Sequence, residues 1–345
     1  MIADEVRAQF PGANGYLDTA SLGLPPTVAI EAMTAALSEW QAGIATAPGY
    51  DRSVEASRGS FADLVSVPEE RVAIGAQVSA LVALAITSLE PGARVLVPEG
   101  EFTSVLFPIL VRDDLHLDVV TVPLEHLAET VDRDTDLVAF SLVQSSDGRI
   151  ADAAAIAEAA RAVGAHTLAD ATHAVGWMPV SADDFDFMVV GTYKWLLSPR
   201  GTAFLTVRTE LIERIRPLYA GWYAGADPWS SIYGLPLRLA PDARRLDLSP
   251  AWLSWVGTSA SLGFIREIGV DAIHEHDVAL ANALRERLGR EATGSAIVAL
   301  TLEANFDPTR LEGLRTSFRS DRLRVGFHLY NTEDDVDRLA AALGC

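Results

Sequence analysis

The sequence predicts an α/β protein with a large domain built on a mostly parallel sheet between helices, and a smaller α+β domain after it. Between residues 72 and 208, short apolar runs such as RVAIG, ARVLVP and HTLAD alternate with alanine-rich stretches such as ADAAAIAEAARAVG. This alternation is typical of βα units whose sheet is covered on both faces. At 345 residues and 49% hydrophobic content, the chain also exceeds the size at which one core usually keeps growing, so two unequal domains are expected.

The boundary between the domains is predicted from residues 219–250, which are rich in aromatic residues, glycine and proline and show little periodicity. A loop this long in a compact protein usually has a function or marks a boundary. The elements expected after it are helices over 252–268 and 277–289, a strand over 296–302, and a final helix with Asn331 or Thr332 as its cap. The units expected are an N-terminal segment that packs on the small domain (1–17), a large domain (18–245) and a small C-terminal domain (246–345).

The composition excludes several classes of partner. A formal charge of −20 repels nucleic-acid phosphates and anionic lipid surfaces. No apolar stretch is long enough to cross a membrane and the first residues do not look like a signal peptide, so we expect a cytoplasmic protein. The only cysteine is Cys345, which leaves no intrachain disulfide and no cysteine cluster for a metal. His274 and His276 point to different faces of an expected helix, so no metal site is expected there.

The chain contains one lysine, Lys194 in GTYKWLLSPRG, and every other basic side chain of fixed charge is an arginine. An arginine stays protonated at any accessible pH, whereas a lysine in an apolar pocket can lose its proton and expose a nucleophilic amine. The apolar residues before Lys194 and the sequence WLL after it indicate such a pocket. We interpret Lys194 as a residue for covalent chemistry, and a chance surface lysine is the alternative.

A nucleophilic amine needs a carbonyl partner, and the commonest one in proteins is pyridoxal 5'-phosphate bound as a Schiff base. This cofactor needs a carboxylate that keeps its pyridine nitrogen protonated. Asp170 ends one expected strand and Lys194 follows the next, so both side chains are expected in one crevice at the carboxyl ends of the strands. An ordinary turn aspartate is the alternative for Asp170.

The phosphate, the ring and an amino-acid substrate need partners as well. A phosphate binds well at a helix N-terminus, and the turn GAQVSA precedes an expected helix. The candidates for the phosphate are Ala76, Gln77, Val78 and Ser79, with hydroxyl groups from Thr192 and Tyr193. Phe102 is the candidate for stacking on the ring, His173 for contacting the phenolic oxygen or the ring face, and Arg324 for the substrate carboxylate. A core phenylalanine, a turn histidine and a surface arginine are the respective alternatives.

Taken together, these segments resemble the class V aminotransferase superfamily of fold type I pyridoxal phosphate enzymes, which includes cysteine desulfurases, selenocysteine lyases, kynureninases and isopenicillin N epimerases. The resemblance covers nearly the whole chain and lies in YLDTASLGLPP, GAQVSA, EGEFTS, DATHAVG, GTYKW and RVGFHLYNTEDDVD, in this order. It implies an aspartate aminotransferase-like fold with a seven-stranded sheet. It also implies that Thr172 binds the cofactor and that His173 acts with Lys194 and Asp170 as a catalytic residue.

The resemblance further implies a homodimer with active sites at the subunit interface. The stretch RRLDLSPAW is similar to the family segment that reaches the neighbouring subunit's phosphate, which points to Ser249 and Trp252. Other positions depart from the family pattern. Ser145 stands where the family often has asparagine, and we expect it near the substrate. Tyr193 and Phe102 are more similar to the kynureninase-like branch, because desulfurases prefer histidine at both places.

The expected function is that of an enzyme acting at the α-carbon of an amino acid with pyridoxal phosphate. The first choice is a lyase that cleaves a β-carbon bond to sulfur or selenium, without the mobile cysteine of persulfide-forming desulfurases, because Cys345 is the last residue. An aminotransferase or epimerase of a specialised amino acid, or a kynureninase-like hydrolase, is the alternative. A nucleotide-binding dehydrogenase also has an alternating α/β pattern, but no G-x-G-x-x-G follows the first expected strand.

Overall fold

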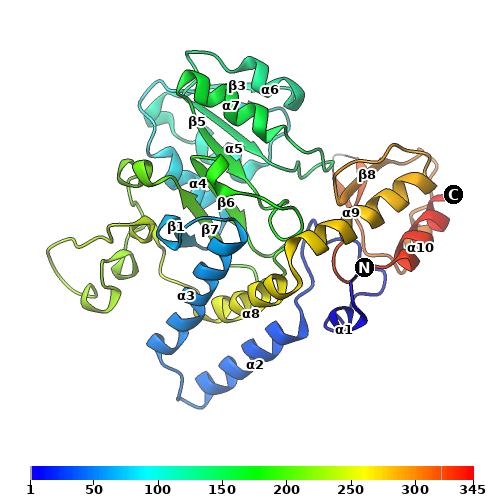
Figure 1. Cartoon of the computed structure of the whole chain (residues 1–345), viewed down its shortest axis with the longest axis horizontal. Helices are drawn as coiled ribbons and strands as arrows, with labels where there is room; N and C mark the ends of the chain where they lie inside the picture. Colours follow the sequence, from blue (N-terminus) through cyan, green and yellow to red (C-terminus); the bar gives the residue numbers. More distant parts are fainter. Residues whose placement is uncertain (1, 320) are drawn as a thin grey trace.

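The computed structural model describes residues 2–319 and 321–345. Over these residues, a seven-stranded sheet has the order β3-β2-β4-β5-β6-β7-β1 (Figure 1). Neighbouring strands run parallel except where β7 pairs with β6 and β1 in antiparallel register. Its strands are β1 (Val72–Gly75), β2 (Arg94–Pro98), β3 (Asp118–Val122), β4 (Leu137–Ser141), β5 (His166–Asp170), β6 (Phe187–Gly191) and β7 (Ala203–Val207). The predicted α/β architecture with a mostly parallel sheet is confirmed.

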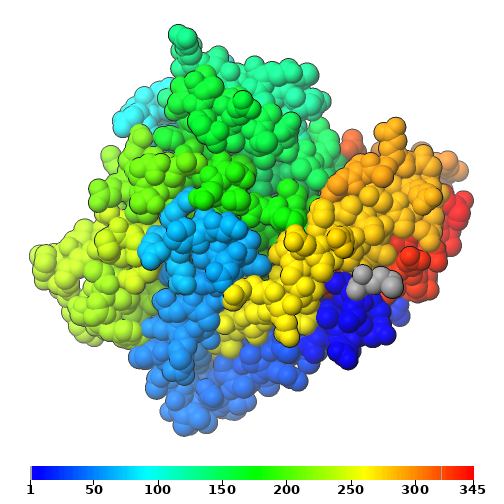
Figure 2. Space-filling view, in the orientation of Figure 1, coloured from blue at the N-terminus to red at the C-terminus, as the bar shows by residue number. Residues whose placement is uncertain are grey.

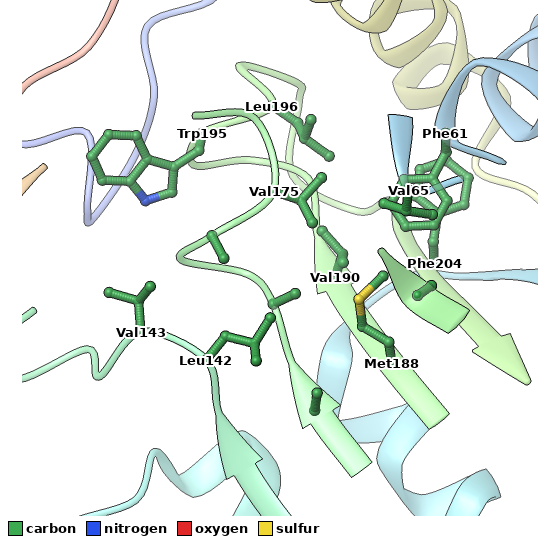
Figure 3. Close-up of a cluster of buried hydrophobic side chains, with 14 of the residues drawn as sticks. Phe61, Val65, Leu142, Val143, Val175, Met188, Val190, Trp195, Leu196 and Phe204 are labelled. Atoms are coloured by element: carbon green, nitrogen blue, oxygen red, sulfur yellow. The ribbon is translucent and has the colours of Figure 1, made fainter. Parts of the chain in front are cut away.

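Helices cover both faces of this sheet, which is why its strands appear in the sequence as continuous apolar runs. In β6, Met188 and Val190 belong to one apolar cluster, while Phe187 and Val189 belong to the cluster on the other face. Figure 3 shows part of the first cluster, in which Phe61 and Phe204 stack at one end and Trp195 lies at the other. The helices of this part of the chain are α2 (Thr27–Gln41), α3 (Ala47–Leu64), α4 (Val78–Ile86), α5 (Thr103–Leu110), α6 (Leu127–Thr130), α7 (Ala153–Val163) and α8 (Trp252–Ile268).

A second, antiparallel sheet of order β8-β10-β9 lies beside the first and carries its own apolar cluster (Figure 1). Its elements are β8 (Ile297–Thr301), β9 (Ser317–Arg319), β10 (Arg322–Gly326), α9 (Val270–Arg287) and α10 (Glu333–Leu343). The chain enters through α1 (Asp4–Arg7), and Leu17 then packs into the cluster of the small sheet. The backbone of Leu17 bonds Arg315 and Gly326 at 2.8 and 2.9 Å. The boundaries set at 17 and 245 stay a prediction.

The final helix shows which of two expected caps is used. Thr332 forms a capping box with Asp335, so the side chain of each accepts a backbone N–H of the other. Asn331 instead accepts the backbone N–H of His328 at 2.9 Å and donates to the carbonyl of Tyr16 at 2.8 Å. Asn331 therefore ties the N-terminal segment to the loop after β10.

Residues 219–250 extend away from the large sheet on the side opposite α10 (yellow-green in Figures 1 and 2). They contain short 3₁₀ turns and expose Tyr233, Leu235 and Leu237, whose relative accessibilities are 87%, 92% and 76%. Single exposed apolar residues are ordinary on a protein surface, but three within five positions mark a patch suited to covering by another surface. No helix among the described residues is both long and apolar enough to span a bilayer.

Candidate active site

The predicted site residues meet at the carboxyl ends of β5 and β6. Asp170 is the last residue of β5 and is paired in register with Ser141 at the end of β4 and with Val189 in β6. Lys194 follows the end of β6 by three residues. The pocket between these strand ends and α4 is lined by Ala76, Gln77, Val78, Ser79, Phe102, Ser104, Ser141, Asp170, Thr172, His173, Gly191, Tyr193, Lys194, Arg200 and Thr202. Most of the cofactor-binding residues expected from the sequence are therefore together.

The turn that carries Lys194 is held by its own backbone and by the N-terminal segment. Leu197 has the left-handed φ of 53°, and its N–H donates to the carbonyl of Lys194 at 3.2 Å. Gly23 donates its N–H to the carbonyl of Tyr193 at 2.9 Å. A Cβ on Gly23 would lie 1.9 Å from the carbonyl oxygen of Lys194, so only glycine permits this approach. The amine is thereby held on a rigid turn.

The Lys194 side chain is buried, and its Nζ lies 2.7 Å from Nε2 of His173. The pKa of Lys194 is lowered from 10.5 to about 7, chiefly by burial; the charge of Asp170 opposes this shift and the nearby arginines add to it. The ammonium form loses hydration on burial and the neutral form does not, which explains the direction. The rings of Phe102 and Tyr193 lie 5.3 and 5.7 Å from Nζ. A substantial fraction of neutral, nucleophilic amine is therefore present near neutral pH.

Asp170 is a buried carboxylate that accepts the backbone N–H of Thr172 at 2.9 Å. Burial raises the pKa of Asp170 to about 6, while its hydrogen bonds with Thr172 and the charge of Lys194 oppose that rise. The hydroxyl of Thr172 in turn accepts the N–H of Gly191 at 2.9 Å, which ties the end of β5 to the end of β6. A carboxylate that is ionised at neutral pH but poorly solvated suits a cationic partner such as a protonated pyridine nitrogen.

Glu101 is a buried carboxylate next to the pocket that sequence reasoning missed. It accepts the N–H of Ser141 at 2.8 Å, the hydroxyl of Ser141 at 2.5 Å and the side-chain amide of Gln144 at 3.2 Å. Its charge contributes to the raised pKa of Asp170. Because Phe102 follows it directly, these bonds fix the loop that presents the aromatic ring. Glu101 lies in the loop after β2, and no sequence pattern there predicts this role.

The end of the pocket expected to bind phosphate is the N-terminus of α4. Gln77 is the N-cap of α4, and its side chain forms no capping hydrogen bond with the N–H groups of the first turn. Ala76, Val78 and Ser79 line the same end. The structure does not bring Thr192 into this group: its hydroxyl lies 2.5 Å from that of Thr202 and 3.0 Å from the Thr202 carbonyl, and it is absent from the pocket lining.

Several lining residues were not anticipated, and some had a usable signal. Ser141 ends β4, which pairs with β5. The carboxyl ends of neighbouring parallel strands meet at one edge of the sheet, and this rule, which predicted the place of Asp170, also predicts that of Ser141. Arg200 lies 5.0 Å from the ring of Tyr193 and brings a positive charge to the pocket. Ser104, Gly191 and Thr202 complete the set. Arg200 gave no pattern in the sequence that distinguished it from the other arginines.

These residues fit the parts of pyridoxal phosphate. A helix N-terminus without a side-chain cap suits the phosphate, and Asp170 suits the ring nitrogen. The amine of Lys194 with its lowered pKa suits the aldehyde. Phe102 lines the pocket and is 40% exposed, so part of its side chain is accessible to a bound ring. Among the described residues no group of three or more histidine, cysteine or acidic side chains is arranged to hold a metal ion.

Arg324 and Ser145 lie together, outside the lining of this pocket. The guanidinium of Arg324 is buried and donates to the carbonyl of Ser145 at 2.5 Å, to the hydroxyl of Ser145 at 3.3 Å and to the hydroxyl of Ser21 at 2.8 Å. All of its acceptors among the described residues are neutral, including Ser317. Burial lowers the pKa of Arg324 to about 10, and its charge acts on Lys194. A buried cation with neutral partners can take an anionic group.

Ser249 and Trp252 also lie outside the pocket of their own chain. Ser249 is exposed, and Trp252 stacks on Tyr50 with ring centroids 5.5 Å apart. The segment before them is anchored by Asp247, whose carboxylate pairs with Arg58 at 2.7 Å in full burial and accepts the N–H of Ile74 at 2.8 Å. This anchor fixes where the segment leaves the large sheet.

The comparisons with known proteins agree with this geometry. The family model described as "Aminotransferase class-V" matches residues 15–304. Isopenicillin N epimerase of Streptomyces clavuligerus is 30% identical over 83% of each chain. Kynureninase of Deinococcus radiodurans is 29% identical over 98% of this chain and 91% of the other. The fold matches that of the apo cysteine desulfurase from Thermococcus onnurineus NA1 with a TM-score of 0.86 at 19% identity, over 99% and 97% of the two chains. The chain therefore belongs to the class V aminotransferase family of pyridoxal-phosphate-dependent enzymes.

Proposed function

We propose that this protein moves the α-proton of an amino-acid substrate and that Lys194 is the base. The observation that supports this most directly is the buried amine 2.7 Å from His173, in the same pocket as Asp170, with its pKa lowered to about 7. An amine with that pKa is close to the optimum for proton transfer at neutral pH, since it is available both to accept and to return a proton.

The other side chains have separate tasks in the proposal. When bound, pyridoxal phosphate supplies an electron sink for the pair left at the α-carbon. Asp170 holds a proton on the ring nitrogen, and the first turn of α4 binds the phosphate. Arg324 binds the substrate carboxylate through donors whose acceptors, over the residues that the structure describes, are all neutral. Phe102 covers one face of the ring and limits access of water.

For the outcome of the reaction, our first candidate is β-elimination from an amino acid with sulfur or selenium on its β-carbon. After the α-proton is removed, the electron pair forms the α,β double bond and the β-substituent leaves with its bonding pair. Cys345 lies after α10, and no other cysteine occurs in the chain, so the proposed lyase releases its sulfur product without transfer to a cysteine near the substrate.

The second candidate is epimerisation or transamination of a specialised amino acid. It is favoured by the 30% identity with isopenicillin N epimerase, compared with 23% and 22% for two probable cysteine desulfurases. A kynureninase-like hydrolase is supported in the same way at 29% identity. These reactions share the α-carbon and the residues named above with β-elimination, and they differ in where the proton and the bonding pair go next.

One experiment in deuterated water separates the candidates. A panel of amino acids, including cystine, selenocysteine and kynurenine, is incubated with the cofactor-loaded protein, with Lys194→Ala as the control. Release of pyruvate and ammonia indicates elimination, and inversion with deuterium at the α-carbon indicates epimerisation. A keto acid formed with stoichiometric amino transfer indicates transamination, and anthranilate indicates hydrolysis. If no substrate tested gives any of these products or exchanges its α-proton for deuterium, the proposal is refuted.

We also propose that the protein is a homodimer in which Ser249 and Trp252 contribute to the neighbouring site. Support comes from their position outside their own pocket, from the anchor at Asp247, and from the exposed patch at residues 233–237. The test mixes two inactive variants, Lys194→Ala and Ser249→Trp, under conditions that exchange subunits. Recovery of about a quarter of the activity is expected, because half of the dimers are mixed and one of their two sites is intact. No recovery between exchanging dimers would contradict shared sites.

A further inference from the structure

Trp195, the residue after the lysine, contacts the imidazole that faces the amine. Its indole is fully buried at the end of the apolar cluster in Figure 3. The indole N–H donates to Nδ1 of His173 at 3.4 Å, while Nε2 of the same ring lies 2.7 Å from Nζ of Lys194. The imidazole thus bridges the indole and the amine.

The indole restricts the protonation of His173. An indole nitrogen only donates, so Nδ1 of His173 must be the acceptor and carries no proton. The single proton of the neutral ring then lies on Nε2, where it points at Nζ of Lys194. A donor at Nε2 needs a lone pair opposite it, and only the neutral amine has one. An ammonium group at Lys194 would require the tautomer of His173 that carries its proton on Nδ1. That N–H would then point at the indole N–H of Trp195, so two donors would face each other.

The indole is itself held in place from the small sheet. Nε2 of His328 donates to the carbonyl of Trp195 at 3.0 Å, and Nδ1 of His328 lies 2.8 Å from the carboxylate of Asp277. Both residues of this pair are fully buried. The ring of His328 also meets the indole edge-on, with centroids 5.3 Å apart. A Cβ on Gly176 would lie 2.4 Å from the same carbonyl oxygen, so the backbone of Trp195 is tightly enclosed.

We propose that Trp195 is a positioning residue that fixes the tautomer of His173 and thereby favours the neutral amine of Lys194. The use made of that amine rests on the proposed function, but the tautomer does not. The pKa values agree in direction: burial lowers the pKa of His173 well below its usual value and that of Lys194 to about 7. The other charges that act on the amine, which a change at Trp195 leaves in place, come from Asp170, Arg324, Arg319 and Arg200.

The test uses the fact that the chain has one lysine. In the full chain freed of cofactor, isotope-labelled lysine gives a single side-chain nitrogen signal, and its titration reports the pKa of Lys194 directly. Trp195→Phe removes the indole donor and keeps an aromatic ring. We expect the pKa of Lys194 to rise by roughly half a unit to one unit, the effect of one hydrogen bond on one protonation state.

Trp177→Phe is the matched control. Trp177 is also fully buried, its ring centroid lies 5.6 Å from that of Trp195, and its indole donates to His173 at 2.6 Å, but to the backbone carbonyl rather than the ring. The control is expected to leave the pKa of Lys194 at the wild-type value. An equal rise in both variants, or no rise in a folded Trp195→Phe protein, would overturn the proposal.

A second measurement needs no variant. With isotope-labelled histidine, the ring nitrogen shifts of His173 in the wild-type chain distinguish the two tautomers, and a proton on Nε2 is expected. A proton on Nδ1 would overturn the proposal even if Trp195→Phe failed to fold. Both measurements are made without cofactor or substrate, so a failure of the proposed function would leave their outcomes unchanged and would be recognised separately by the deuterium exchange assay.

Discussion

Replacing Lys194 with methionine is expected to stabilise the cofactor-free protein at neutral pH. Burial disfavours the protonated form of Lys194 in the folded chain, and its pKa falls from 10.5 to about 7. At about 1.4 kcal/mol per pH unit, this difference corresponds to roughly 5 kcal/mol of lost stability at or below pH 7. Methionine has a similar shape and no charge, but it forfeits the hydrogen bond to His173, which offsets about 1 kcal/mol. The variant is therefore expected to be more stable by roughly 4 kcal/mol.

The pH dependence of this difference is the sharper test. Between pH 7 and 10.5 the unfolded wild-type chain keeps the lysine proton that the folded chain lacks, so wild-type stability rises with pH relative to the variant. Urea unfolding at about pH 7 and about pH 9.5 should show the advantage of the variant shrinking by roughly 3 kcal/mol. Titrating groups that do not interact with Lys194 are common to both proteins and cancel. Asp170, with a pKa of about 6, and His173, whose burial lowers its pKa well below the usual value, titrate mainly below this pH range. A constant difference, or a variant less stable at pH 7, would refute the reasoning.

Three further substitutions separate the tasks assigned to other residues. Asp170→Asn is expected to weaken cofactor binding or leave the bound cofactor inactive, because an amide cannot hold the pyridinium proton. An absorbance titration measures cofactor binding and a turnover assay measures activity, and normal turnover would contradict the role of Asp170. Arg324→Ala is expected to raise KM by about tenfold or more with little change in cofactor Kd, and equal losses in both would contradict carboxylate binding. Asp247→Ala leaves Arg58 as a buried unpaired cation and should cost about 3–5 kcal/mol in urea unfolding, whereas a loss below about 1 kcal/mol would show that the anchor is dispensable.

Much of the fold could be predicted because both faces of the large sheet are buried. Apart from the partly exposed edge strand β3, the strands then appear as short apolar runs, and a helix such as α7 appears as an alanine-rich stretch. The family and the cofactor followed from Asp170 and Lys194, which stand at the ends of adjacent runs, and both are confirmed by the comparisons. The order of the strands and the antiparallel β7 depend on long-range pairing, which no local pattern reveals.

The residues that reasoning from sequence missed act through contacts between distant segments. Glu101 bonds the end of β4, and Trp195 meets His173 across two turns. Thr192 shows the opposite case: the sequence offered a hydroxyl beside the lysine, but the turn directs it to Thr202. Ser249 and Trp252 lie outside the pocket of this chain, and their expected role depends on a second chain. These distinctions come from side-chain direction, which spacing along the chain does not determine.

The central claim is that Lys194 is the residue that holds pyridoxal phosphate covalently. The most direct measurement is the absorption spectrum of the cofactor-loaded protein before and after borohydride, followed by mass analysis of its peptides. We predict that reduction fixes the cofactor on the peptide GTYKWLLSPR at Lys194, and that Lys194→Ala shows neither the visible band nor the modified peptide. A wild-type protein that stays colourless with added cofactor, or that is reduced at the N-terminal amine instead, would contradict the account.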